Sequence, residues 1–209
     1  MVRPSTPVTR EAVIDAALRI VEQEGVRQLS MRKLAAELGV AVTAIYWHVG
    51  NREALLDALV EREIADARRI RPSGRTPEAR LVSIARALRT MLLARPHVIA
   101  LVNERGLTPL MFLPAQAALA SELEAAGLKG ERVALAVRAI QYHAIGFVVL
   151  ERWTERSPEQ RPTAAELWRE HALAAGVSPR VARDLGEPFA PPQVFEFATR
   201  ALVRAVLAG

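Results

Sequence analysis

The chain has 209 residues, of which 51% are hydrophobic, enough for one sizeable helical body or for a small domain joined to a larger one. It contains no cysteine, which excludes disulfides, thiolate metal sites and cysteine nucleophiles. The net charge of +5 suits a polyanionic partner, but the basic residues are spread along the chain and do not by themselves locate a binding surface.

Nearly every segment has the apolar period of a helix and no convincing alternating strand is present, so the sequence predicts an all-α fold. The first helix follows Thr9, a plausible N-cap, and stops at Gly25. Ser30 caps the next helix, and a fourth helix is expected over residues 51–70. The Arg-Pro-Ser-Gly break at 71–74 is the best internal boundary in the chain.

Beyond this break the same period predicts a second, larger helical body. Its helices are expected over residues 77–94, 97–104, 109–126, 131–156, 164–175, 181–185 and 193–207. The N-terminal residues lack the apolar stretch of a secretory signal, and no uninterrupted apolar run approaches the roughly 20 residues of a membrane span. We therefore expect a cytoplasmic protein without membrane attachment.

The most informative pattern lies in residues 30–52, which read as two short helices joined by a tight turn at Gly39. Glycine can take the positive φ that this turn demands. The positions expected to bury apolar surface are Leu34, Ala35, Leu38, Val40 and Ile45. The side chains left for the outside are Met31, Arg32, Lys33, Thr43, Tyr46, Trp47 and His48. This is the pattern of a helix-turn-helix, and it predicts DNA binding.

Three runs in this region resemble the tetracycline-repressor (TetR) family: Leu-Ser-Met-Arg-Lys-Leu-Ala at 29–35, Ile-Tyr-Trp-His-Val at 45–49 and Asn-Arg-Glu-Ala-Leu-Leu-Asp-Ala-Leu at 51–59. The Tyr-Trp-His-Val form looks closer to the tetracycline repressors proper than to the wider family. The resemblance implies an all-α homodimer, with an N-terminal three-helix head on a larger C-terminal body. The expected domains are a helix-turn-helix head at 1–52, a connecting helix and linker at 53–75, and a ligand-binding and dimerisation body at 76–209.

Matched to the family position by position, Arg32 reaches base edges, where its fork can bond guanine O6 and N7 together. The alternative for Arg32 is a solvated phosphate contact. Lys33 is assigned to the DNA backbone, and Thr43 to a thymine methyl or a phosphate. Tyr46 and His48 are expected to hydrogen-bond phosphates at the wall of the groove.

Two further DNA-binding candidates follow in the sequence. Trp47 either packs beneath the helix or contacts DNA, and its spacing favours packing. Arg52, at the start of the fourth helix, adds positive charge beside free N–H groups that can hold a phosphate. The fourth helix would then connect the head to the body.

The apolar helices of the body carry scattered polar groups, as ligand pockets do, although each group alone is more often part of the core or the surface. The ligand-binding candidates are Asn103, Met111, Phe112, Gln116, Tyr142, His143 and Glu151, with His97, Glu104, Gln141 and Trp153 as further members. Residues 103–109 lack the histidine expected of a tetracycline–magnesium site, and His143 and Glu151 match its spacing imperfectly. We expect an unidentified apolar or amphipathic effector, with no metal and no cofactor.

No motif of a hydrolase elbow, a zinc protease or a phosphate-binding glycine loop is present, so no enzymatic activity is expected. The favoured hypothesis is a homodimeric repressor that a small-molecule effector releases from a double-stranded DNA operator. Its dimer would be a four-helix bundle of the helices over 131–156 and 193–207. The alternatives are a constitutive DNA-binding dimer without effector and a small-molecule-binding helical protein with a disused head.

Overall fold

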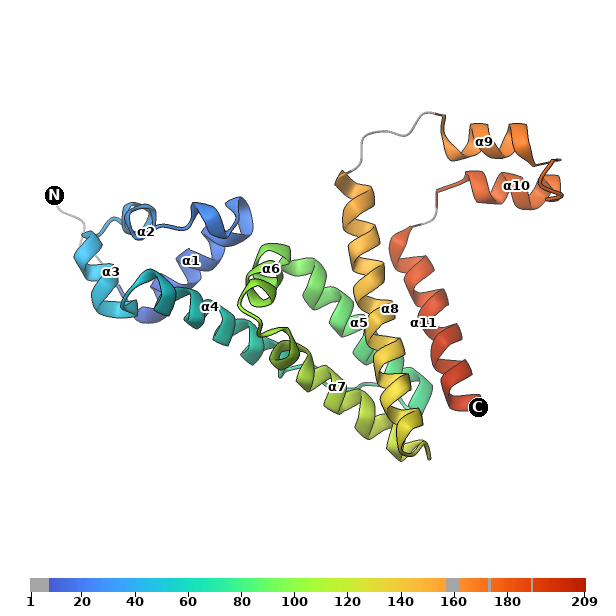
Figure 1. The fold of residues 1–209 in the computed structure, drawn as a ribbon, viewed down its shortest axis with the longest axis horizontal. Helices are drawn as coiled ribbons and strands as arrows, with labels where there is room; N and C mark the ends of the chain where they lie inside the picture. Colours follow the sequence, from blue (N-terminus) through green and yellow to red (C-terminus); the bar gives the residue numbers. More distant parts are fainter. Residues whose placement is uncertain (1–7, 157–161, 173, 189) are drawn as a thin grey trace.

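The computed structural model describes residues 8–156, 162–172, 174–188 and 190–209. Across these ranges the chain forms eleven α-helices and one 3₁₀ turn, with no strand, which confirms the all-α prediction. Figure 1 shows an elongated molecule, with a small head of α1 to α3 at one end and a larger helical body at the other.

The head consists of α1 (Arg10–Glu24), a 3₁₀ turn (Val26–Gln28), α2 (Met31–Leu38) and α3 (Val42–Val49). The side chain of Thr9 caps α1 by accepting a hydrogen bond from the N–H of Ala12, as the sequence predicts. Helix α1 packs against both α2 and α3. The head therefore has its own apolar core, which holds the two short helices in place.

Helix α4 (Arg52–Ala67) joins the two parts, because it packs against α1 and α3 on one side and against α6 and α7 on the other (Figure 1). Asn51 caps it by accepting a hydrogen bond from the N–H of Ala54 at 2.8 Å. The helix is shorter than the 51–70 expected from the sequence. Since α4 contacts both parts, the domain limits at residues 52 and 75 stay a prediction.

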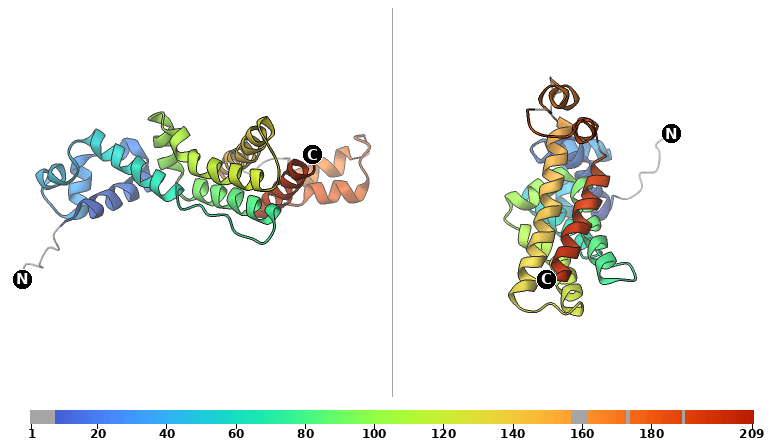
Figure 2. Two further views of the ribbon diagram at one scale, coloured as in Figure 1. Left: turned by 90° about the horizontal axis from the view of Figure 1, so that it is seen from below. Right: turned by 90° about the vertical axis from the view of Figure 1, so that its right-hand side faces the viewer.

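The body is built around α5 (Pro77–Ala94), which packs against α7 (Thr108–Ala125), α8 (Glu131–Arg156) and α11 (Pro191–Ala208). The shorter α6 (Pro96–Glu104) lies between α5 and the head, where it contacts α1 and α4. Helices α8 and α11 lie side by side at the end away from the head (Figure 2). These bounds agree closely with the expected helices.

By length and composition alone α8 could cross a bilayer, since its most apolar window within residues 131–155 has a mean hydropathy of 1.7. In the fold 39% of that window is buried, against α5, α7 and α11. An apolar helix with one face inside a protein core passes the same test of composition, so this finding is weak evidence for a membrane span.

Helices α9 (Ala164–His171) and α10 (Pro179–Gly186) form a hairpin whose members pack mainly against each other, and it projects beyond the body (Figures 1 and 2). Thr163 and Glu166 begin α9 with reciprocal side-chain-to-backbone hydrogen bonds, the capping box. Helix α9 is shorter than the expected 164–175, and α10 is longer than the expected 181–185.

Candidate DNA interface and ligand cavity

The turn between α2 and α3 has the local geometry that the sequence predicts. The Ser30 hydroxyl accepts a hydrogen bond from the N–H of Lys33 at 3.2 Å and so caps α2. Gly39 ends α2 in the left-handed conformation, with φ of 66°, where any other residue pays a steric penalty. Ile45 and Leu34 are fully buried between the helices. The remaining face of α3 is left toward solvent.

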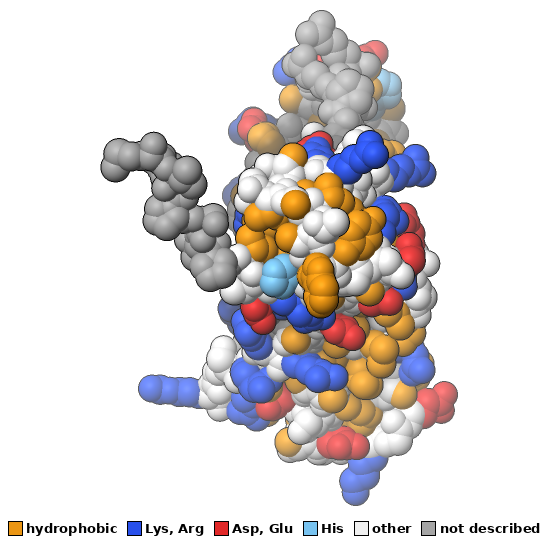
Figure 3. Space-filling model, turned by 90° about the vertical axis from the view of Figure 1, so that its left-hand side faces the viewer, with side chains coloured by type: hydrophobic (Ala, Val, Ile, Leu, Met, Phe, Trp, Pro, Cys, Tyr) orange, Lys and Arg blue, Asp and Glu red, His pale blue; other side chains and the backbone are white. Residues whose placement is uncertain are grey.

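Three side chains of α3 share this outer face, because Thr43, Tyr46 and Trp47 stand three and four positions apart and together line a shallow hollow. Figure 3 shows this end of the molecule, where hydrophobic side chains gather at the front with Lys and Arg side chains around them. All three residues are exposed. A surface that mixes ring faces, a hydroxyl and nearby cations fits a duplex better than a protein core.

Trp47 is 90% exposed, so the expectation that it packs beneath the helix is wrong. It stands two positions from buried Ile45 and two from buried Val49, and at 3.6 residues per turn that offset points its indole to the opposite side. The exposed position of Trp47 is compatible with the other alternative, contact with DNA.

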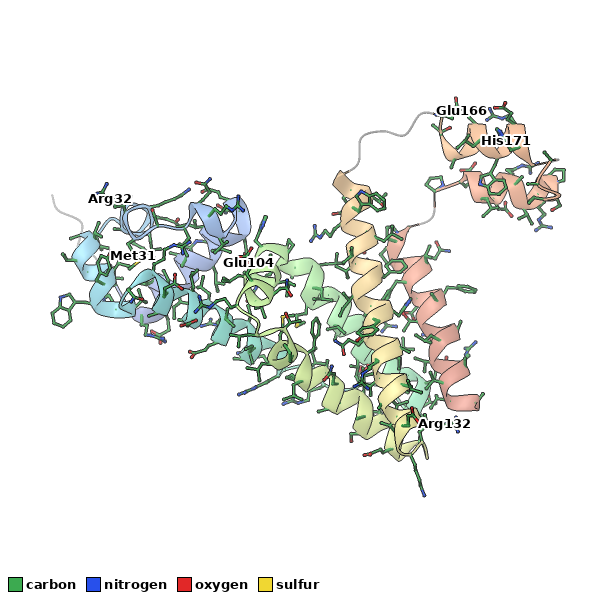
Figure 4. The ribbon with its side chains drawn as sticks, in the orientation of Figure 1. Met31, Arg32, Glu104, Arg132, Glu166 and His171 are labelled. Atoms are coloured by element: carbon green, nitrogen blue, oxygen red, sulfur yellow. The ribbon has the colours of Figure 1, made fainter. Side chains whose placement is uncertain are left out.

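Met31 is a second correction, because the sequence places it outside and the structure buries it. It shares the face of Leu34, Ala35 and Leu38 by helical period, and these residues face the core of the head. Arg32, one position on, is exposed and makes no hydrogen bond or ion pair within the described residues. Figure 4 shows the two side chains on opposite sides of α2, with Arg32 directed outward.

The other basic candidates already have partners in the head. Lys33 forms an ion pair with Glu24 of α1. Arg52 donates to the carbonyl oxygens of Leu29 at 3.2 Å and Val26 at 3.1 Å, so its guanidinium fastens the segment before α2 to the start of α4. In this conformation Arg52 positions the helix-turn-helix and does not extend toward a phosphate. His48, on α3, is half-buried.

The body contains a cavity of about 640 Å³ between the end of α5 and helices α6, α7 and α8. Its lining is mostly apolar: Leu92, Pro96, His97, Ile99, Ala100, Asn103, Thr108, Met111, Phe112, Ile145, Val148, Val149, Arg152 and Trp153. The candidates Asn103, Met111 and Phe112 are brought together here, along with His97 and Trp153. The size and apolar character are those of a small-molecule site.

The ligand-binding candidates Gln116, Tyr142, His143 and Glu151 do not line this cavity. Gln116 donates to Gln141 at 2.7 Å, which ties α7 to α8. Tyr142 is exposed on the outer face of α8. His143 lies 3.0 Å from the Thr199 hydroxyl and stacks on Phe195 of α11. Burial lowers the pKa of His143, so this ring favours its neutral form.

Glu151 lies in a buried ion pair with Arg89 of α5, with distances of 2.7 and 2.8 Å from one guanidinium nitrogen to the two carboxylate oxygens. It therefore joins α8 to α5 instead of facing the cavity. Glu104 is exposed at the end of α6 (Figure 4).

Arg152 is a lining residue that the sequence analysis missed. The signal was available, because Arg152 stands four residues after Val148 and seven after Ile145 on the same face of α8.

Ion pairs connect the cavity to the head through α6, which supplies five of the lining residues. Arg95, just before α6, pairs with Glu22 of α1 at 3.2 Å and with Glu63 of α4. Arg105, just after α6, pairs with Glu53 at 2.8 Å and with Asp57, both on α4. Both ends of α6 are thus fixed to the helix that carries the head. Within the described residues no group of three or more histidine, aspartate and glutamate side chains is placed to hold a metal ion.

Comparison with known proteins agrees with this architecture. Residues 13–59 match the family model for bacterial regulatory proteins of the tetR family. The chain is 30% identical over 175 residues to the tetracycline repressor protein class G of Vibrio anguillarum, which covers 77% of this chain and 78% of that protein. The chain belongs to the TetR family.

Other relatives match this TetR-family chain over shorter stretches. It is 32% identical over 144 residues to an HTH-type transcriptional regulator of Saccharopolyspora erythraea, covering 69% of this chain but 61% of that protein. The class D tetracycline repressor of Escherichia coli is 48% identical over 58 residues, which covers 28% of this chain and 27% of that protein. The chain thus spans less than two thirds of these two curated relatives. All three relatives bear the names of regulators or repressors, not of enzymes.

Solved structures share the whole fold. The Streptomyces coelicolor regulator SCO7222 matches with a TM-score of 0.71 at 19% identity, covering 96% of this chain and 98% of that chain. TetR from Acinetobacter baumannii AYE matches with a TM-score of 0.61 at 25% identity, covering 95% and 96%. The head-on-body arrangement is therefore that of the family.

Proposed function

We propose that this TetR-family chain is a sequence-specific DNA-binding transcriptional regulator, acting as a homodimeric repressor that a small molecule releases from its operator. The observation that carries the proposal is the exposed surface of the helix-turn-helix. On α2, Arg32 is exposed and makes no ion pair within the described residues, and on α3 the exposed Thr43, Tyr46 and Trp47 line one hollow. A fully buried scaffold behind this face holds it rigid. The likeness to a tetracycline repressor over 77% of this chain supports repression over activation.

In this mechanism α3 enters the major groove and Arg32 of α2 reaches a base edge beside it. Thr43 and Tyr46 contact the backbone at the groove wall, and Trp47 lays its ring against sugar or base. Lys33 exchanges its partner Glu24 for a phosphate. The Lys33–Glu24 ion pair is solvent-exposed and therefore weak, so it is readily replaced. Two heads on a two-fold dimer would read half-sites about 34–36 Å apart along one face of the duplex.

The dimer would form through the outer faces of α8 and α11, which lie side by side. On α8 the exposed residues Leu135, Tyr142 and Val149 recur every seven positions, the spacing of a helix-packing stripe. Phe197 is exposed on the neighbouring α11. The inner face of α8 is already buried in the body, so its outer face has no apolar partner within the described part of the chain. A second copy of the chain that covers these exposed residues would supply that partner.

Release would run from the cavity through α6 to α4. A ligand that prefers a shifted position of α6 also shifts α4, because Arg95 and Arg105 fix both ends of α6 to carboxylates of α4. A shift of α4 in both subunits changes the separation of the heads. By linkage, operator DNA must then weaken ligand binding by the same factor by which the ligand weakens DNA binding.

The test is fluorescence anisotropy of the purified protein on duplexes from the intergenic region upstream of its own gene, against a scrambled duplex at two salt concentrations. We expect Arg32→Ala to weaken operator binding by roughly 5- to 150-fold, the worth of a bidentate arginine–guanine contact, and to leave scrambled binding almost unchanged. Lys33→Ala should weaken both duplexes and reduce the salt slope.

Arg132→Ala is the matched control, because Arg132 is an exposed arginine on the body at the far end from the head (Figure 4). It should bind both duplexes like the wild type. Equal losses on operator and scrambled duplex for Arg32→Ala would contradict base reading. Specific binding that no small molecule changes would favour a constitutive regulator, and no binding at either salt would favour a ligand-binding protein with a disused head.

A further inference from the structure

The cavity of the body has an uneven charge. Among the residues that the structure describes, its lining includes Arg152, with His97 as the other titratable side chain, and no aspartate or glutamate. Most of the remaining surface is apolar or aromatic, supplied in part by Met111, Phe112 and Trp153. A molecule inside would therefore meet one permanent positive charge and no negative one from the lining.

The guanidinium of Arg152 is only partly satisfied by its own chain. One terminal nitrogen donates to the carboxylate of Glu155 at 3.1 Å, and the other donates to the carbonyl oxygen of Leu93 at the end of α5. Its Nε is buried and has no hydrogen-bond partner in the described part of the chain. A guanidinium has five N–H donors, so each terminal nitrogen keeps a second N–H that an acceptor on a ligand can use.

The nearby carboxylates do not neutralise this site. Glu151, the neighbour of Arg152 in sequence, is held by Arg89 on the α5 side. Glu155 is about half exposed, and an ion pair with an exposed carboxylate contributes little. The net charge that faces the cavity therefore stays positive.

We propose that the cavity takes a planar aromatic anion, whose acidic group is bound by Arg152 while its rings lie against Met111, Phe112 and Trp153. An oxygen anion suits arginine because the guanidinium offers parallel N–H donors in one plane. The polar groups of Asn103 and Thr108, which lie 3.2 Å apart, are available to a hydroxyl or carbonyl elsewhere on the ligand. This inference deepens the proposed function, and it rests on the proposal that the cavity is the effector site of the regulator.

The test compares two fluorescent probes that differ in one group, 1-anilinonaphthalene-8-sulfonate and the uncharged N-phenyl-1-naphthylamine. Both are titrated into the full-length protein without DNA. We expect the wild type to bind the sulfonate at least tenfold more tightly than the uncharged probe. Arg152→Gln should remove most of this preference and keep the affinity for the uncharged probe within about twofold, while Arg152→Lys should keep part of the preference.

Two control variants locate the effect. Arg138→Gln removes an exposed arginine of the same helix, whose side chain donates to the carbonyl of Ala134, and should change neither affinity. Ala100→Trp places a large side chain at an exposed lining position and should abolish binding of both probes, which separates the cavity from other apolar surfaces. Circular dichroism spectra matching the wild type verify that each variant is folded.

Equal losses of both probes in Arg152→Gln would overturn the proposal, because Arg152 would then only shape the cavity. An unchanged preference for the sulfonate in that variant would overturn it as well, since the anion would be bound elsewhere. Operator anisotropy measured with and without the sulfonate probe keeps the two hypotheses apart. If the preference for the sulfonate depends on Arg152 but the bound probe does not change the affinity for operator DNA, the result supports the ligand chemistry and contradicts the release mechanism.

Discussion

Replacing Glu151 by glutamine should strongly destabilise the body. Arg89 and Glu151 form an ion pair in which the side chains keep only 12% and 9% of their exposure. Arg89 also lies over the ring of Phe195, 5.3 Å from its centre, and its Nε has no hydrogen-bond partner among the described residues. Glu151→Gln therefore leaves a buried cation with a neutral acceptor in place of a carboxylate.

Removing one member of a buried ion pair costs about 3–5 kcal/mol, and we expect about 3 kcal/mol here because both side chains keep some contact with water. At roughly 2–4 °C per kcal/mol for a chain of this size, the unfolding midpoint should fall by about 6–12 °C. The measurement is urea and thermal unfolding followed by circular dichroism, at one fixed protein concentration because the chain is expected to dimerise.

The matched control is Arg86→Gln, one turn earlier on α5. Arg86 pairs with Glu196 of α11 at 2.8 Å, but the two side chains are 53% and 32% exposed, so its loss should cost less than about 1 kcal/mol. The double variant Arg89→Met with Glu151→Leu should recover most of the lost stability, because no charge is left buried. A loss for Glu151→Gln no larger than for Arg86→Gln would refute the reasoning.

Three further predictions concern other parts of the molecule. Gly39→Ala should lower the free energy of unfolding by about 1–2 kcal/mol, measured by thermal unfolding, because φ is 66° at this position. Gly39→Asn should lower it less. A Cβ at this position meets no atom within 4 Å, so equal losses for the two variants would contradict a conformational cause. Phe197→Glu should yield a monomer in sedimentation at micromolar concentration, and a persistent dimer would place the interface elsewhere. Because burial lowers the pKa of His143, the unfolded chain binds a proton at this ring more tightly than the folded chain does. The stability that neutral His143 contributes is therefore fully present above the ordinary histidine pKa of 6.5, and it is lost as the pH falls below 6.5. His143→Gln should therefore flatten the dependence of the unfolding midpoint on pH below 6.5, and an unchanged slope would assign the dependence to another group.

The local structure of this protein can be read from its amino-acid sequence alone. Thr9, Ser30 and Gly39 set helix limits through hydrogen bonds and backbone angles within three or four residues of themselves, so their effects can be read from neighbours in the chain. The helical period of the apolar residues likewise located the body helices closely. The same period puts Met31 on the buried face of Leu34, so the burial of Met31 also follows from the sequence. The resemblance of the head to a known family rested on the same local residues.

The contacts between side chains of different helices could be seen only in the folded chain. Glu151 and Arg152 are adjacent on α8, yet one pairs with Arg89 and the other lines the cavity, because successive helical residues point about 100° apart. Arg52 is a free cation in the sequence, but the fold brings it to the carbonyl groups of Val26 and Leu29, some 25 residues away. Contacts of this range depend on how whole helices cross, and the period of one helix fixes its buried face but not the neighbour that covers it.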